Sequence, residues 1–103
     1  MGVMWVRALE LASLPPGEVR PFTYHGREFV LCNHAGEIRA LDGECPHANG
    51  PLAQGNFVDG FLVCPWHAWE FDTATGLCPH NSRAAVRRYE TEVREGAIFI
   101  RLA

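Results

Sequence analysis

The sequence predicts an all-β protein, an antiparallel β-sandwich or barrel into which a small subdomain is inserted. Three observations support this fold class. Near both ends of the chain, apolar residues fall in short runs that Gly-containing turns separate. No stretch of about 12 or more residues keeps a clean helical period. Asp59 and Gly60 form a pair that is typical of tight β-hairpins, because both turn positions favour left-handed backbone geometry.

Each expected strand is a run of apolar or β-branched residues bounded by turn residues. Three runs in the first half follow one another through turns at Gly26 and Gly36, as in a β-meander, and a turn at Gly96 joins the last two runs. The final run is apolar on both faces except at Arg101, which predicts a central position in a sheet. Residues 9–14 form at most a short helical turn before a Pro-Pro-Gly sequence. The expected strands are residues 4–8, 19–24, 28–33, 37–41, 56–59, 61–64, 69–72, 85–93 and 97–102.

A chain of 103 residues has room for one domain with one hydrophobic core. We therefore expect a single domain, residues 1–103. Within it, residues 1–41 and 82–103 are expected to form a basal β part. Residues 42–81 are rich in Gly, Pro, Cys, His and Trp and contain only brief apolar runs, so they are expected to form the inserted subdomain.

Charge and hydropathy exclude several classes of function. The formal net charge is −3, and there is no basic stripe that would attract a phosphate backbone, so nucleic-acid binding is not expected. Arg7 and Glu10 interrupt the most apolar stretch near the N-terminus, which is not typical of a signal peptide. No run approaches the roughly 20 apolar residues that a membrane-spanning helix needs. We expect a soluble, cytoplasmic protein with no membrane partner.

Four cysteines stand at positions 32, 45, 64 and 78. In a small secreted domain an even number of cysteines would predict disulfides. In the reducing compartment expected for this chain, cysteines are more often metal ligands. Two of the four also lie close to histidines, at short and fixed spacings. Metal binding is therefore favoured over disulfide bonding.

The strongest motif consists of Cys45-Pro-His47 and, further along the chain, Cys64-Pro-Trp-His67. Each half offers one thiolate and one imidazole on a tight loop that a proline stiffens. The hairpin predicted at Gly60 would bring the two loops face to face. Two cysteines and two histidines are compatible with a tetrahedral zinc site. They are also compatible with two irons, one held by both thiolates and the other by both imidazoles.

The residues around this motif resemble those of the Rieske ferredoxin family. Residues 45–52 (Cys-Pro-His-Ala-Asn-Gly-Pro-Leu) and 64–72 (Cys-Pro-Trp-His-Ala-Trp-Glu-Phe-Asp) carry the resemblance, which extends over nearly the whole chain. The resemblance implies a Rieske-like fold and one [2Fe–2S] cluster per chain. Its ligands would be Cys45 and Cys64 on an inner iron and His47 and His67 on an outer iron near the surface. Structural zinc is the competing interpretation.

Other residues of the same types are expected not to be ligands. Cys78-Pro-His80 repeats the first triplet, but no cysteine follows it, and the resemblance implies that it covers the cluster. His25 and His34 fall in predicted turns and are expected to be solvated. Cys32 lies in an apolar run, as a small buried residue does. Trp66 and Trp69 are either core aromatic residues or an apolar shield and docking face.

The resemblance also implies a place within the family. Rieske proteins of respiratory complexes carry a disulfide between the two loops, at positions that correspond here to Gly50 and Trp66, so that bridge cannot form. Those proteins also place hydroxyl donors near the cluster sulfurs, where this chain has Trp69 and Phe71. Phe71 has no hydrogen-bond donor, and Trp69 offers only its indole N–H. We therefore expect a low-potential cluster.

The expected function is electron transfer. The chain has no Gly-x-Gly-x-x-Gly fingerprint and no convincing site for a mononuclear iron, so it is interpreted as a carrier and not an enzyme. The resemblance implies the ferredoxin component of an aromatic-ring-hydroxylating dioxygenase system, whose partners are an NAD(P)H-dependent flavoprotein reductase and a terminal Rieske non-haem iron oxygenase. The small subunit of an assimilatory nitrite reductase is the alternative. Partners are expected to dock at an apolar tip formed by His47, Trp66, His67 and Pro79.

Overall fold

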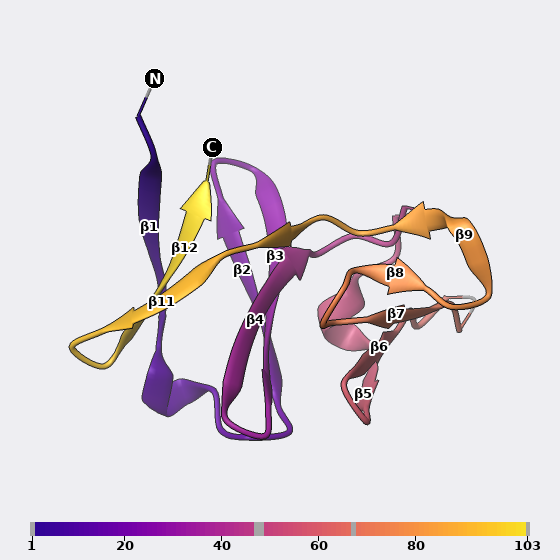
Figure 1. The fold of residues 1–103 in the computed structure, drawn as a ribbon, viewed down its shortest axis with the longest axis horizontal. Helices are drawn as coiled ribbons and strands as arrows, with labels where there is room; N and C mark the ends of the chain where they lie inside the picture. The colour runs from indigo at the N-terminus through magenta and orange to yellow at the C-terminus, as the bar shows by residue number, and fades with distance from the viewer. Residues whose placement is uncertain (1, 47–48, 67, 103) are drawn as a thin grey trace.

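The computed structural model describes residues 2–46, 49–66 and 68–102, which are almost entirely β-structure, as the sequence predicted (Figure 1). In this part of the chain, no helix is long and apolar enough to cross a membrane. Short 3-10 helices lie at Leu11–Ser13 (η1) and Leu52–Gln54 (η2). The strands are Met4–Glu10 (β1), Val19–Tyr24 (β2), Arg27–His34 (β3), Glu37–Asp42 (β4), Asn56–Val58 (β5), Phe61–Val63 (β6), Glu70–Asp72 (β7), Leu77–Cys78 (β8), Asn81–Ala85 (β9), Arg88–Tyr89 (β10), Thr91–Arg94 (β11) and Ala97–Leu102 (β12).

The strands form antiparallel sheets. Two sheets with longer strands, which contain β1 to β4 and β10 to β12, lie at one end of the molecule, and two smaller sheets, formed by β5 to β9, lie at the other (Figure 1). The order β1-β12-β11 makes β12 the central strand of its sheet, as its two apolar faces predicted. The order β10-β4-β3-β2 contains the predicted meander. The smaller sheets have the orders β5-β6-β7 and β8-β9.

Strand β3 separates two hydrophobic cores. Successive side chains of a strand point to opposite faces, and both faces of β3 are buried. Val30 and Cys32 enter a core shared with the smaller sheets, whereas Phe29 and Leu31 enter a core shared with β12. The first core, called core 1 below, contains Val30, Cys32, Leu41, Cys45, Leu52, Leu62, Cys64, Phe71, Cys78, Ala84 and Val86. One sheet thus supports both ends of the molecule.

Two-residue turns set the register of the hairpins. At the turn between β5 and β6, Asp59 has φ 51° and Gly60 has φ 82°, the left-handed geometry that the Asp-Gly pair predicted. The turns that precede β3, β4 and β12 also have positive φ values at both positions. Because these turns twist in the same sense as the strands, each hairpin stays in register.

The expected single strand over residues 85–93 is wrong. The structure divides this segment into the end of β9, then β10, which pairs with β4, and β11, which pairs with β12. The reason is that the segment passes from one core to the other: Ala84 and Val86 are buried in core 1, but Tyr89 is buried in the other core. The pairing partner of the segment changes along its length, from β8 to β4 and then to β12, so it does not form one strand. The short elements β8, β9 and η2 were not predicted either.

A buried hydrogen-bond network ties the large sheet to the turn before β6. The side chain of Thr73 is fully buried, and its hydroxyl donates to the carbonyl of Gly60 over 2.6 Å. Nη1 of Arg39, on β4, donates to the same hydroxyl over 2.9 Å. The guanidinium is held in turn by the carboxylate of Glu37, 3.0 Å away, and this ion pair lowers the pKa of that carboxyl. The network fixes the β6–β7 hairpin against β4.

We expect Thr73→Val to destabilise the protein by about 1–3 kcal/mol, because it leaves the Arg39 donor and the Gly60 carbonyl without this partner. Thr23→Val is the matched control, since the Thr23 hydroxyl donates only to exposed Glu28, over 2.9 Å. Its effect should stay within about 0.5 kcal/mol. Denaturant unfolding measures both. Equal stability of the two variants would contradict the structural role of the network.

Candidate metal centre

Two loops bring Cys45 and Cys64 into core 1. The first loop, residues 43–51, follows β4 and is described at residues 43–46 and 49–51. The second loop, residues 64–69, follows β6 and is described except at residue 67. Both cysteine side chains are buried, with exposed fractions of 0% and 1%, and neither forms a disulfide. The other two predicted ligands, His47 and His67, lie outside the described residues.

The two loops repeat one backbone arrangement. In the first, the N–H of Cys45 donates to the carbonyl of Gly50 over 2.9 Å, and its carbonyl accepts from the N–H of Asn49 over 2.7 Å. In the second, Cys64 donates to Trp69 over 2.8 Å and accepts from Ala68 over 3.0 Å. The residue four positions after each cysteine has a positive φ, 59° in the first loop and 57° in the second. The same local fold therefore presents a thiol twice.

Gly50 is where the two loops meet. A Cβ atom at this position would lie 2.7 Å from Sγ of Cys64 and 3.3 Å from Cδ2 of Trp66. The first distance is shorter than real Cβ contacts, so only glycine lets the first loop approach the Cys64 sulfur this closely. The contact also makes positions 50 and 66 neighbours, as expected for the two positions that correspond to the inter-loop disulfide of respiratory Rieske proteins.

These features fit a metal centre held by both loops. Cysteine binds metals as a thiolate, and an iron–sulfur centre is compatible with a buried, largely apolar setting that water does not fill. Cys45 and Cys64 provide two buried thiols in such a setting, on matched loops that contact each other. Within the described ranges, no group of three or more Cys, His, Asp or Glu side chains is arranged to hold a metal ion, so the structure does not offer a different site in that part of the chain.

The Cys-Pro-His triplet at residues 78–80 lies beside this region. Cys78 is buried in core 1, whereas Pro79 and His80 are exposed. Nε2 of His80 lies 3.0 Å from Oε1 of Glu70 on β7, so the imidazole is engaged at the surface. The triplet therefore packs Cys78 inward while its histidine contacts a carboxylate.

The remaining cysteine is buried, as expected. Cys32 is fully buried on β3, and burial raises the pKa of its thiol to about 11, although a hydrogen bond with Thr73 acts in the opposite direction. The thiol stays protonated at neutral pH and is a poor nucleophile.

Of the two histidines expected in solvated turns, one was wrongly placed. His25 is exposed and lies beside the ring of Tyr24, with the ring centroids 4.3 Å apart. His34 is the last residue of β3 and is half-buried, because its ring covers Gly60 and lies edge-on to Phe57, with ring centroids 6.2 Å apart. The sequence did not show that the β5–β6 hairpin folds back against this position.

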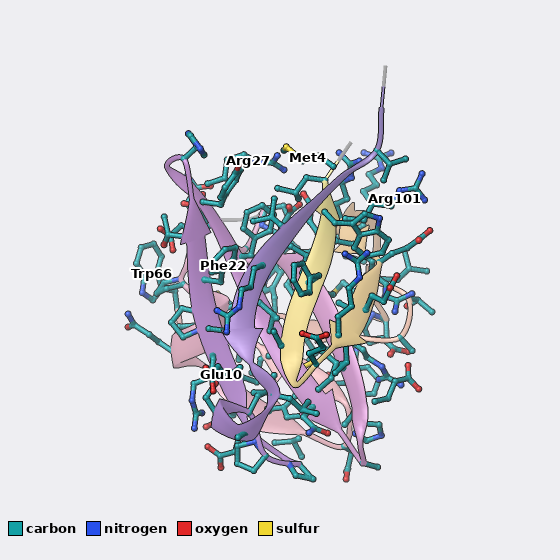
Figure 2. The ribbon with its side chains drawn as sticks, turned by 90° about the vertical axis from the view of Figure 1, so that its left-hand side faces the viewer. Met4, Glu10, Phe22, Arg27, Trp66 and Arg101 are labelled. Atoms are coloured by element: carbon teal, nitrogen blue, oxygen red, sulfur yellow. The ribbon has the colours of Figure 1, made fainter. Side chains whose placement is uncertain are left out.

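The two tryptophans of the second loop have different environments. Trp69 is half-buried and packs against core 1, next to fully buried Phe71. Trp66 has an exposed fraction of 56%, and its side chain projects from the edge of the molecule (Figure 2). Trp69 is thus a core aromatic, and Trp66 supplies apolar surface next to the loops.

A family model described as the Rieske [2Fe-2S] domain matches residues 4–90. The chain therefore belongs to the Rieske [2Fe–2S] domain family, and its cofactor is a [2Fe–2S] cluster, as the sequence predicted. The ferredoxin component of the naphthalene 1,2-dioxygenase system of Pseudomonas putida is 30% identical over 105 residues, which cover 100% of both chains. Cholesterol 7-desaturase nvd 1 of Ciona intestinalis is 40% identical over 76 residues, which cover 72% of this chain but 16% of the desaturase.

Solved structures share the fold over nearly the full length. The ferredoxin of carbazole 1,9a-dioxygenase from Nocardioides aromaticivorans IC177 superposes with a TM-score of 0.86 at 28% identity, covering 94% of this chain and 96% of that one. A proposed NADH-dependent nitrite reductase small subunit from Mycobacterium tuberculosis gives 0.89 at 21% identity, covering 100% and 98%. A chain in a complex of reduced oxygenase and oxidized ferredoxin in carbazole 1,9a-dioxygenase gives 0.86 at 21%, covering 93% and 91%.

The steric role of Gly50 yields a prediction about cluster loading. In Gly50→Ala, the added methyl group would displace the Cys64 sulfur, and we expect iron and acid-labile sulfide per chain to fall to less than about half of the wild-type content. Gly2→Ala is the control, because nothing lies within 4 Å of its added Cβ. Metal and sulfide analysis, with the visible spectrum, measures the outcome. Full loading with unchanged spectra would show that the loops have room for a side chain.

Proposed function

We propose that Cys45 and Cys64 bind the inner iron of the cluster and that His47 and His67 bind the outer iron. The support is the matched geometry of the two loops: each presents a buried thiol, and each carries one histidine two or three residues later. Loops of this kind belong to a cluster-binding subdomain, residues 42–81, on a basal part formed by residues 1–41 and 82–103. Strand β9 runs across the second of these boundaries.

We propose that the chain is a one-electron carrier and not an enzyme. The cluster supplies reversible one-electron chemistry, and histidine ligation raises its potential above that of plant-type ferredoxins. The protein works against a further rise. Fully buried Phe71 places a ring without a hydrogen-bond donor in core 1, next to the second loop. Fewer hydrogen bonds to cluster sulfurs stabilise the reduced state less, which favours the low-potential part of the Rieske range.

The proposed partners are an NAD(P)H-dependent flavoprotein reductase, which donates the electron, and a terminal aromatic-ring-hydroxylating oxygenase, which accepts it. The single observation that carries this proposal is the end-to-end match, at 30% identity, with the ferredoxin component of the naphthalene 1,2-dioxygenase system. The alternative, a small subunit of an assimilatory nitrite reductase, is supported by a likeness of fold to the Mycobacterium tuberculosis protein.

The ligand assignment is tested by single substitutions. Wild-type protein should contain two irons and two acid-labile sulfides per chain. His47→Ala and His67→Ala should abolish or strongly reduce incorporation, because each removes one proposed ligand. Cys78→Ser is the control at a buried cysteine outside the proposed set, and it should retain the visible and EPR spectra. Loss of the cluster in Cys78→Ser would make the assignment wrong.

The choice of partner is tested by reconstitution with the redox proteins encoded beside the gene. With a flavoprotein reductase and a terminal oxygenase, addition of the chain should make NAD(P)H oxidation depend on an aromatic substrate, because the chain completes the electron path. Rate and product formation are measured with and without the chain. Stable co-purification with a sirohaem nitrite reductase, together with no stimulation of any oxygenase, would favour the alternative.

A further inference from the structure

The segment that carries both loops is acidic. Residues 42–81 contain five carboxylates and no lysine or arginine. Arg83, on β9, is the first cation after this segment, and the sheet β8-β9 lies at the same end of the molecule as β6 and β7 (Figure 1). Among the residues of strands β5 to β9, Arg83 is the one cation, and it contributes to the charge pattern that a partner meets.

Arg83 is exposed and lines a groove on the side of the first loop. Pro46, Trp69, Asn81 and Ala84 form the rest of its lining. In the described part of the chain, no carboxylate lies within ion-pair distance of the Arg83 guanidinium. Five arginines have such partners, namely Arg7, Arg20, Arg39, Arg94 and Arg101, whereas Arg27, Arg87 and Arg88 resemble Arg83 in having none among the described residues. The charge of Arg83 is thus not neutralised within the described molecule.

Pro46 also lines a second groove, whose charge is of the opposite sign. Its lining includes three carboxylates, Glu28, Asp42 and Glu44, and one cation, Arg27. Arg27 is engaged elsewhere: it donates to the hydroxyl of Tyr89 over 2.8 Å and its guanidinium lies 5.0 Å from the centroid of the Phe29 ring.

The carboxylates of the second groove differ in whether they have hydrogen-bond or ion-pair partners within the molecule. Asp42 accepts from the Tyr89 hydroxyl over 2.6 Å, and Glu28 accepts from the Thr23 hydroxyl over 2.9 Å. Glu44 is exposed and has no ion pair with a described residue. It is therefore the carboxylate of this groove that is freest to pair with another molecule.

On the side of the second loop, the corresponding groove has no charged residue in its lining. A groove along the second loop is lined by Gln54, Asn56, Pro65, Trp66 and neighbouring residues, none of them charged. Charge is therefore concentrated beside the first loop, and its sign changes across Pro46. A pattern of two signs fixes the rotation of a partner about the docking axis, whereas a surface of one sign only attracts it.

We propose that Glu44 and Arg83 form a charged rim that sets the orientation of the terminal oxygenase, which places a basic side chain against Glu44 and a carboxylate against Arg83. This inference rests on the proposed function, and the oxygenase is chosen because a chain of the same fold occurs in an oxygenase–ferredoxin complex. The exposed ring of Trp66 supplies apolar contact at the same end, and the rim determines which way round the contact is made.

The test compares charge reversals at the rim with matched reversals far from it. The rim variants are Arg83→Glu and Glu44→Arg. The controls are Arg7→Glu and Glu10→Arg, at an exposed ion pair on β1, at the opposite end of the molecule (Figures 1 and 2). Each reduced, cluster-loaded variant is mixed with oxidised oxygenase in a stopped-flow instrument, and the second-order rate constant is measured at about 0.02 M and about 0.5 M salt.

We expect each rim variant to lower the rate constant about tenfold at low salt and less than about twofold at high salt, with the controls near wild type and all spectra unchanged. The two rim substitutions move the net charge in opposite directions, so attraction by net charge alone would slow one and accelerate the other. That result, or wild-type rate constants in both rim variants, would overturn the proposal that Glu44 and Arg83 orient the oxygenase. A wild-type chain that passes no electrons to the oxygenase would instead refute the proposed function, and the rim with it.

Discussion

The end of the molecule that we propose as the cluster site depends on how closely the two loops approach each other, and Gly50 sets that distance. A Cβ atom there would lie 2.7 Å from the sulfur of Cys64. Both loops hold their cysteines through the same pair of backbone hydrogen bonds, so neither thiol is positioned by a flexible side chain alone. Because both cysteines are also buried in core 1, displacement of one loop would disturb the packing beneath the other. The two halves of the centre are therefore mechanically coupled.

The large sheets support these loops through shared packing and hydrogen bonds. The loops are short and connect small strands, so they have little core of their own. Strand β3 contributes one face to core 1, and the network of Arg39, Thr73 and Gly60 joins β4 to the β6–β7 hairpin. At the start of the first loop, Asp42 accepts hydrogen bonds from the Tyr89 hydroxyl and from the N–H of Arg87. A centre whose surroundings move little between redox states exchanges electrons with little reorganisation.

The sequence predicted most strands because their signals are local. Alternation and X-Gly turns gave the meander β2-β3-β4, and the two apolar faces of 97–102 gave its central position. It failed over 85–93, since nothing local shows that Ala84 and Tyr89 belong to different cores. The cysteines proposed as ligands were predicted from their spacing to histidines, which is a property of the chain alone. The steric role of Gly50 and the burial of His34 depend on contacts between distant segments, so local patterns could not reveal them.

The acidic character of residues 42–81 bears on the potential as well as on docking. Reduction adds an electron to the cluster, and carboxylates nearby oppose the added negative charge. This acts in the same direction as the lack of a hydrogen-bond donor on the side chain of buried Phe71. The carboxylates are at or near the surface, where water and salt screen them, so their effect on the potential is smaller than their effect on an approaching partner. A protein that must meet partners quickly and release them can thus adjust its surface charges for recognition while its buried residues set the potential.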